Sequence, residues 1–213
     1  MATNTGMTTV DAINELVETV NEFPMSGSTK PSGSGDTTSI YARAETFIDR
    51  ENRRVQALGW PENTTLSRAV TSESGVKTVL VESYLSVRAA GPDQHRSLVM
   101  RKINDGSPAQ DYTKLYDADT QSYDITATIG GVVYLDTVEL LDFEFLPNHL
   151  QDVIVARAKM TFQRRIQGNA DADQQLMQEY AQAEQLAFRN KPDLDQNFNI
   201  RPSFGTAPDK QQG

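Results

Sequence analysis

The fold is decided by residues 146–190, which read LPNHLQDVIVARAKMTFQRRIQGNADADQQLMQEYAQAEQLAFRN. Pro147 suits the first position of a helix because its missing N–H needs no partner there. Gly168 suits the left-handed conformation that closes a helix, so this stretch predicts two helices with a tight break at Gly168-Asn169. Their stripes, spaced three or four residues apart, are Leu150, Val153, Ile154, Ala158, Thr161, Phe162 and Ile166 in the first and Leu176, Tyr180, Ala183 and Ala187 in the second. Two helices cannot bury these stripes alone, so further elements must pack on them.

Two more amphipathic helices are predicted before residue 60. Thr8 and Thr9 are suitable N-caps for the first helix, and Asp36 or Thr37 for the second, which runs to about Leu58. The segment 25–36 between them is rich in Gly, Ser and Thr, a composition typical of a flexible loop. The stripes are Val10, Ile13, Leu16, Val17 and Val20, then Ile40, Ala44, Phe47, Ile48, Val55 and Leu58.

Between residues 61 and 145 the apolar period changes to two. The runs 79–87, 98–103, 125–129 and 132–141 are strand-like. Asn104-Asp105-Gly106 and Gly130-Gly131 are turn signals between them. Several short strands with turns at this spacing predict an antiparallel β-sandwich or small barrel.

The order of elements predicts an α+β fold: a four-helix bundle with the β domain inserted between helices two and three, and an extended C-terminal arm. The predicted domains are the bundle (8–59 with 147–190), the β domain (60–146) and the arm (191–213). Trp60 and Phe162 are expected in the core where bundle and β domain meet. The arm has no periodic pattern but keeps Phe198, Ile200 and Phe204, so it is expected to order against a partner.

Composition excludes several classes of site. The 213 residues carry a net charge of −9 and contain no cysteine, so disulfides and thiolate metal sites are absent. A free nucleic-acid binder is normally basic, which argues against that class. No apolar run reaches the length of a membrane span, and the first residues lack the features of a signal peptide.

Acidic and histidine residues do not form a convincing reactive site. Asp117, Asp119 and Asp124 resemble the start of a calcium loop, but Gln121 and Ser122 occupy its acidic and glycine positions, which favours an Asp-rich turn. A carboxylate pair drawn from Glu139, Asp142 and Glu144 would suit a small hydrolase, yet no nucleophile or cleft motif accompanies it. His95 and His149 lack the helical spacing of a zinc site. No metal, cofactor or catalytic residue is therefore predicted.

Charged helix faces are the better candidates. The arginines are interpreted as partners for acidic residues of a neighbouring subunit rather than for DNA, although a solvated face is the usual explanation of such runs. The residues concerned are Arg50, Arg53, Arg54, Arg157, Arg164 and Arg165, with Asp171, Asp173, Glu179 and Glu184 as their partners.

Four segments occur in an order that points to one family. They are DAINEL at 11–16, VQALGW at 55–60, LYDADTQS at 115–122 and LDFEFLP at 141–147, followed by Ala158, Phe162, Gln163 and Gly168. In this series the chain resembles, over about residues 8–190, the tail tubular protein A family of short-tailed, podovirus-type bacteriophages, the head-to-tail adaptors or gatekeepers.

The resemblance implies a non-enzymatic virion protein of the tail, assembled in the host cytoplasm. It implies a ring of twelve subunits between the portal and the tail nozzle, tail tubular protein B, with phage DNA passing through without sequence-specific binding. No membrane or cofactor is implied. The C-terminal segment would grip the portal through Phe198, Ile200, Arg201 and Phe204. Two alternatives stay open: an internal or scaffold-like phage protein that forms no ring, and a small carboxylate-dependent hydrolase.

Overall fold

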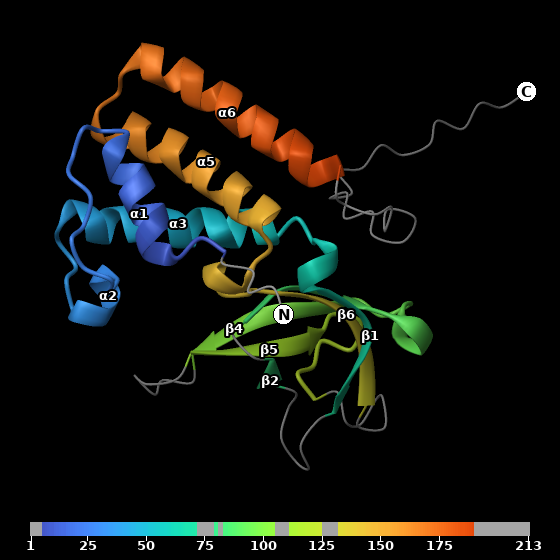
Figure 1. Ribbon diagram of the computed structural model, residues 1–213. Coiled ribbons are helices and arrows are strands. Elements are labelled where there is room, and N and C mark those ends of the chain that lie inside the picture. The colour runs from blue at the N-terminus through green and yellow to red at the C-terminus, as the bar shows by residue number, and fades with distance from the viewer. Residues whose placement is uncertain (1–5, 72–78, 81–82, 105–110, 125–131, 190–213) are drawn as a thin grey trace, which may run out of the picture.

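The computed structural model describes residues 6–71, 79–80, 83–104, 111–124 and 132–189. Within them the chain is a mixed α/β protein with five α-helices and two antiparallel sheets. The helices form one part of the molecule and the strands another, joined by two short segments (Figure 1). The predicted combination of helices with antiparallel strands is therefore confirmed, while the division into domains stays a prediction.

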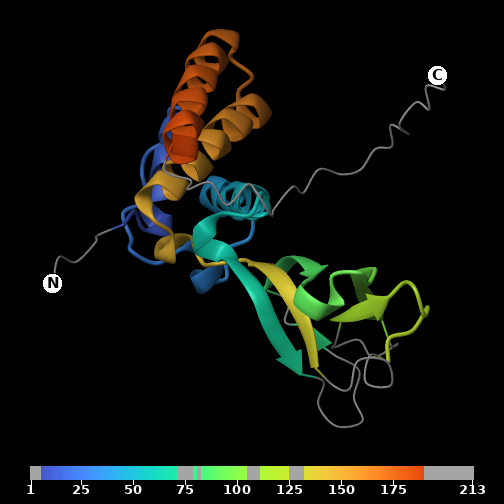
Figure 2. The same ribbon diagram turned by 90° about the vertical axis from the view of Figure 1, so that its right-hand side faces the viewer.

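Four longer helices make up most of the helical part. They are α1 (Thr9–Glu18), α3 (Ile40–Gln56), α5 (Asn148–Ile166) and α6 (Ala170–Arg189). α6 lies along α5, whereas α3 runs obliquely across α5 and contacts α1 (Figures 1 and 2). The predicted stripes largely face one another, except that Leu58 follows the end of α3 and is exposed. The shared core contains Ala12, Ile13, Leu16, Val17, Ala44, Ile48, Val55, Leu150, Val153, Ile154, Ala158, Phe162 and Ala187.

The helix ends follow local capping chemistry. Thr8 caps α1 and forms a capping box with Asp11, as the sequence suggests. The N-cap of α3 is Ser39 rather than Asp36 or Thr37, because Asp36 Oδ1 accepts the amides of Thr38 and Ser39 in a turn before the helix.

The break between α5 and α6 is the predicted one. Pro147 is the N-cap of α5, one position before the expected N1. At the other end Gly168 has a φ of 68° and donates its amide to Gln163 O at 2.9 Å. This left-handed conformation reverses the chain into α6.

The segment 25–36 is more ordered than its composition indicates. It contains the short helix α2 (Pro31–Ser34). The carboxylate of Glu45 on α3 accepts the Ser32 amide at 2.8 Å as well as the Ser32 hydroxyl. Asn14 on α1 accepts the Met25 amide at 2.7 Å. The prediction of a flexible loop is wrong because α1 and α3 supply hydrogen-bond partners that composition does not reveal.

In its described residues, the β part contains two three-stranded sheets. One has the order β1 (Thr64–Thr71), β6 (Val132–Glu139), β3 (Tyr84–Ala89); the other has β2 (Val79–Leu80), β5 (Asp111–Asp117), β4 (Leu98–Asn104). All pairings are antiparallel, and β4 and β5 pair from Leu98 with Asp117 to Asn104 with Asp111. The predicted run 125–129 and the turn residues Asp105-Gly106 and Gly130-Gly131 lie outside the described residues. Both sheets contribute to one small core of Ala89, Leu98, Leu115, Val133 and Leu135.

Buried amides join the helical part to the β part. The side chain of Gln56, fully buried at the end of α3, pairs with the backbone of Leu141: Nε2 donates to Leu141 O and Oε1 accepts the Leu141 amide, both at 2.8 Å. Asn63, in the 3-10 helix η1 (Pro61–Asn63), donates to Gln56 O at 3.0 Å and Glu139 O at 2.8 Å. The two segments that connect the helical part to the β part, around Asn63 and Leu141, are therefore both hydrogen-bonded to the end of α3.

Trp60 lies at this joint, as expected. Its indole N–H donates to Val55 O at 2.7 Å, and its ring centroid is 5.3 Å from that of Phe188 on α6. Phe162 instead lies in the helical core, where it makes an edge contact with Phe47, so its predicted place at the junction is wrong.

Two further 3-10 helices in the described residues are η2 (Gly91–Asp93) and η3 (Phe143–Phe145).

Candidate functional site

Three arginines converge on one buried carboxylate between α3 and α5. Glu51 on α3 has no solvent-exposed side-chain surface. Its Oε1 accepts from Arg50 Nε at 3.0 Å and from Arg54 Nη1 at 2.9 Å, while Arg157 Nε on α5 lies 3.0 Å from Oε2. We call these four residues the Glu51 cluster.

The Glu51 cluster presents positive charge to solvent. A buried carboxylate costs several kcal/mol unless cations compensate it, and here three guanidinium groups surround a single anion. Arg50, Arg54 and Arg157 remain 44%, 51% and 30% exposed. Each guanidinium has five N–H donors, and Glu51 takes only part of them. The cluster is thus a preorganised basic surface.

Aromatic rings hold two of these arginines in place. The guanidinium carbon of Arg50 lies 4.3 Å from the centroid of the Phe47 ring, and that of Arg157 lies 5.8 Å from that of Tyr180 on α6. The Tyr180 hydroxyl donates to Glu184 at 2.6 Å. Burial, together with the hydrogen bond to the Glu184 carboxylate, raises the pKa of Tyr180.

The other predicted interface residues are spread over the helical part. Arg164 forms an ion pair with Asp173 inside the chain, and this hydrogen bond raises the pKa of Arg164. Arg53 lines a pocket at the joint, while Arg165 and Asp171 are exposed at the α5–α6 turn. Glu179 accepts from Gln175 at 3.3 Å. The predicted contacts with a neighbouring subunit stay predictions.

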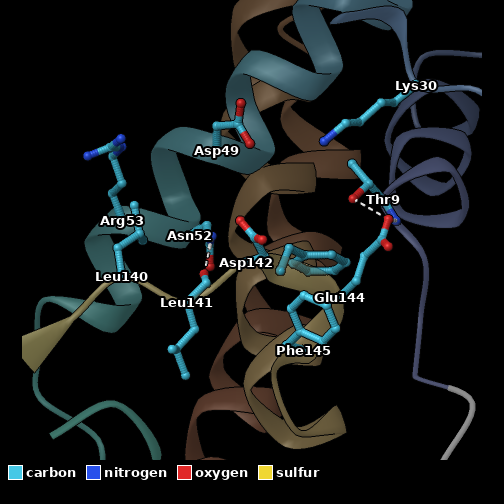
Figure 3. Close-up of a pocket in the computed structure, with 11 residues that line it drawn as sticks. Thr9, Lys30, Asp49, Asn52, Arg53, Leu140, Leu141, Asp142, Glu144 and Phe145 are labelled. Atoms are coloured by element: carbon cyan, nitrogen blue, oxygen red, sulfur yellow. Dashed lines mark hydrogen bonds between the residues drawn. The ribbon is translucent and has the colours of Figure 1, made fainter. Parts of the chain in front are cut away.

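A polar pocket of about 280 Å³ lies at the joint (Figure 3). Asp49 and Asp142 face one another across it, and Lys30 approaches from the loop before α2, while Arg53 points away. Partial burial beside Glu45 raises the pKa of Asp49. The pocket therefore holds mixed charge, with the Lys30 ammonium group beside the carboxylates.

The carboxylates considered for hydrolysis have structural contacts. Glu139 pairs with Arg68 across the sheet edge. Glu144 accepts the Thr9 amide at 3.0 Å and hydroxyl at 2.9 Å, bonds that lower the pKa of Glu144 and fix the start of α1. Asp142 faces the joint pocket. Asp142 and Glu144 thus line the same pocket, whereas Glu139 is not part of its lining.

The Asp-rich segment after β5 is a turn, as predicted. Asp117 Oδ1 accepts the amides of Asp119 at 2.9 Å and Thr120 at 3.3 Å. Asp119 accepts the Ser97 amide at 2.9 Å, which lowers the pKa of Asp119. Asp124 donates its amide to Ser122 Oγ. These aspartates organise the backbone.

Neither a metal cluster nor a membrane span is found in the described residues. No three His, Cys, Asp or Glu side chains of this part gather as metal ligands would. His149 instead lies 3.5 Å from Glu62. None of the described helices combines the length and apolarity needed to cross a bilayer. The predicted arm residues Phe198, Ile200, Arg201 and Phe204 lie outside the described residues.

Most of the chain matches one known family. The family model for tail tubular proteins matches residues 10–197, which covers the helical part and the β part together. The chain belongs to the tail tubular protein family. Tail tubular proteins are structural components of the phage tail, so the chain is a structural virion protein. A comparison with curated proteins gives no match.

Sequence reasoning missed the centres of both polar networks. Glu51 lies between Ile48 and Val55 on the buried side of α3, and this position within the stripe was the available signal. Gln56 carries the same signal, four residues after Asn52. A charged or amide residue inside an apolar stripe is buried only with partners, and one partner of each, Arg157 for Glu51 and Leu141 for Gln56, lies far away in sequence.

Proposed function

We propose that this tail tubular protein is the head-to-tail adaptor of a podovirus-type phage: a subunit of a twelve-membered ring between the portal and the tail nozzle, tail tubular protein B. Family membership over residues 10–197 carries the proposal. In it, the helical part acts as a four-helix bundle and the β part as a sandwich-like domain. Their fixed joint at Gln56 and Asn63 supports this role because ring subunits must hold one shape.

The surface charge of the chain supports a passive channel wall. The net charge of −9 disfavours tight binding of phosphate groups. DNA would therefore pass through the ring without sequence-specific contacts. The subunits would assemble in the host cytoplasm before they become part of the virion tail.

Portal binding is assigned to the arm, residues 191–213. Deletion of residues 192–213 should weaken portal binding at least tenfold, about 1.4 kcal/mol, because the arm loses Phe198, Ile200 and Phe204. The unfolding midpoint should not change. Portal affinity is measured with immobilised portal protein, and deletion of residues 206–213, which spares the apolar residues, is the matched control. Equal affinity of the 192–213 deletion and the full chain would refute the assignment.

The competing function is that of an internal or scaffold-like phage protein. Such a protein would bind partners without closing a ring. A chain that stays monomeric in the presence of portal protein favours this second function over the adaptor.

A further inference from the structure

An acidic groove lies between α1, α5 and α6. Its charged residues are Glu15 and Glu18 from α1, Lys159 from α5 and Glu179 from α6. Lys159 forms an ion pair with Glu15. Glu18 and Glu179 are exposed, and among the described residues neither contacts a cation. The groove thus contains three carboxylates and one ammonium group.

The charge composition of the groove is the inverse of that of the Glu51 cluster. The cluster contains three guanidinium groups and one carboxylate, and so carries two positive charges in excess. The groove carries two negative charges in excess. The two surfaces therefore have complementary charge.

These surfaces lie on opposite flanks of the α5–α6 hairpin. Arg157 and Lys159 are two positions apart on α5, which turns their side chains about 200° from each other. Arg157 points to α3 through Glu51, and Lys159 points to α1 through Glu15. One copy cannot bring its own cluster to its own groove.

We propose that the Glu51 cluster of one subunit docks against the acidic groove of a second copy. This inference rests on the proposed ring function and names the surfaces that close it. Unlike surfaces on opposite flanks make a head-to-tail contact, and repetition of such a contact generates a ring when the rotation closes. The occupant is a second copy rather than DNA because the acidic groove on the same chain supplies the complementary charge.

Charge reversal and charge exchange test this contact. Arg54→Glu or Glu179→Lys places like charges across the contact, which costs several kcal/mol. Each should raise the concentration for half-assembly by about tenfold or more, since tenfold is 1.4 kcal/mol. The double variant Arg54→Glu/Glu179→Lys should restore assembly, because each contact then holds an exchanged pair. Assembly is followed by sedimentation velocity over a concentration series and by counting subunits on purified tails.

Lys102→Glu is the matched control, since it makes the same charge change on the exposed surface of β4 and should leave assembly unchanged. If Arg54→Glu does not fold, the assembly of Glu179→Lys alone tests the contact. If Arg54→Glu and Glu179→Lys both form rings as readily as the wild-type chain, the assignment of these surfaces is overturned. The adaptor function is not affected by that result. A wild-type chain that is monomeric alone and on tails overturns the ring itself. If Arg54→Glu weakens binding to duplex DNA but not assembly, the cluster contacts phosphate and the proposal fails.

Discussion

Glu51→Gln should lower the free energy of unfolding by about 3 kcal/mol, as expected when one member of a buried ion-pair network is removed. The substitution keeps the size of the side chain but removes the anion that compensates Arg50, Arg54 and Arg157. The new amide group would also direct N–H donors toward guanidinium donors. Urea unfolding followed by the fluorescence of Trp60, the single tryptophan, measures the change.

The salt dependence of stability shows whether Glu51→Gln is destabilised by electrostatic repulsion or by lost packing. The three arginines are partly exposed, so added salt screens their mutual repulsion, and the deficit of Glu51→Gln should shrink as sodium chloride increases. Glu22→Gln is the control, because Glu22 is exposed and such surface changes stay within about 0.5 kcal/mol. A Glu51→Gln variant as stable as the control would show that the cluster does not stabilise the α3–α5 contact.

Gln56→Ala should lower the free energy of unfolding by about 4 kcal/mol, the sum expected from a cavity and from buried polar groups that lose their partners. The backbone amide and carbonyl of Leu141 would each lose a hydrogen bond of 2.8 Å, and Asn52 Oδ1 would lose its donor. Hydrogen exchange at the Leu141 amide should accelerate along with the loss of stability measured in urea.

Gln182→Ala provides the comparison for the joint. Gln182 is exposed on α6, and its replacement should change stability by no more than about 0.5 kcal/mol. If Gln56→Ala leaves both stability and Leu141 exchange at wild-type values, the buried amide does not hold the helical part and the β part together.

The parts of the fold that could be predicted from the sequence depend on local patterns. The stripes of α1, α3, α5 and α6 follow from residue spacing, and the φ of 68° at Gly168 agrees with its place after a periodic run. Alternation also predicts β4, whereas β1 and β5 lie outside the runs that the sequence marks as strand-like. The N-cap of α3 lies two to three residues after the predicted position, because Asp36 accepts the amides of Thr38 and Ser39 in a turn before the helix.

The polar networks could not be predicted because each depends on one partner that is distant in sequence. Arg157 contacts Glu51 although the whole β part separates α3 from α5 in the sequence. Leu141 reaches Gln56 across 85 residues. The arginine run at 50–54 was interpreted as a surface for another subunit, whereas the structure shows that Arg50 and Arg54 also bind a buried carboxylate. Both roles are compatible, since each guanidinium retains exposed surface.

We propose that this tail tubular protein forms the ring that joins portal to tail. Electron micrographs of the purified chain bound to portal protein test it most directly. The adaptor function predicts a closed ring of twelve subunits coaxial with the portal and open along its axis. Portal particles that bind separate copies without a closed ring, or that bind none, would contradict it.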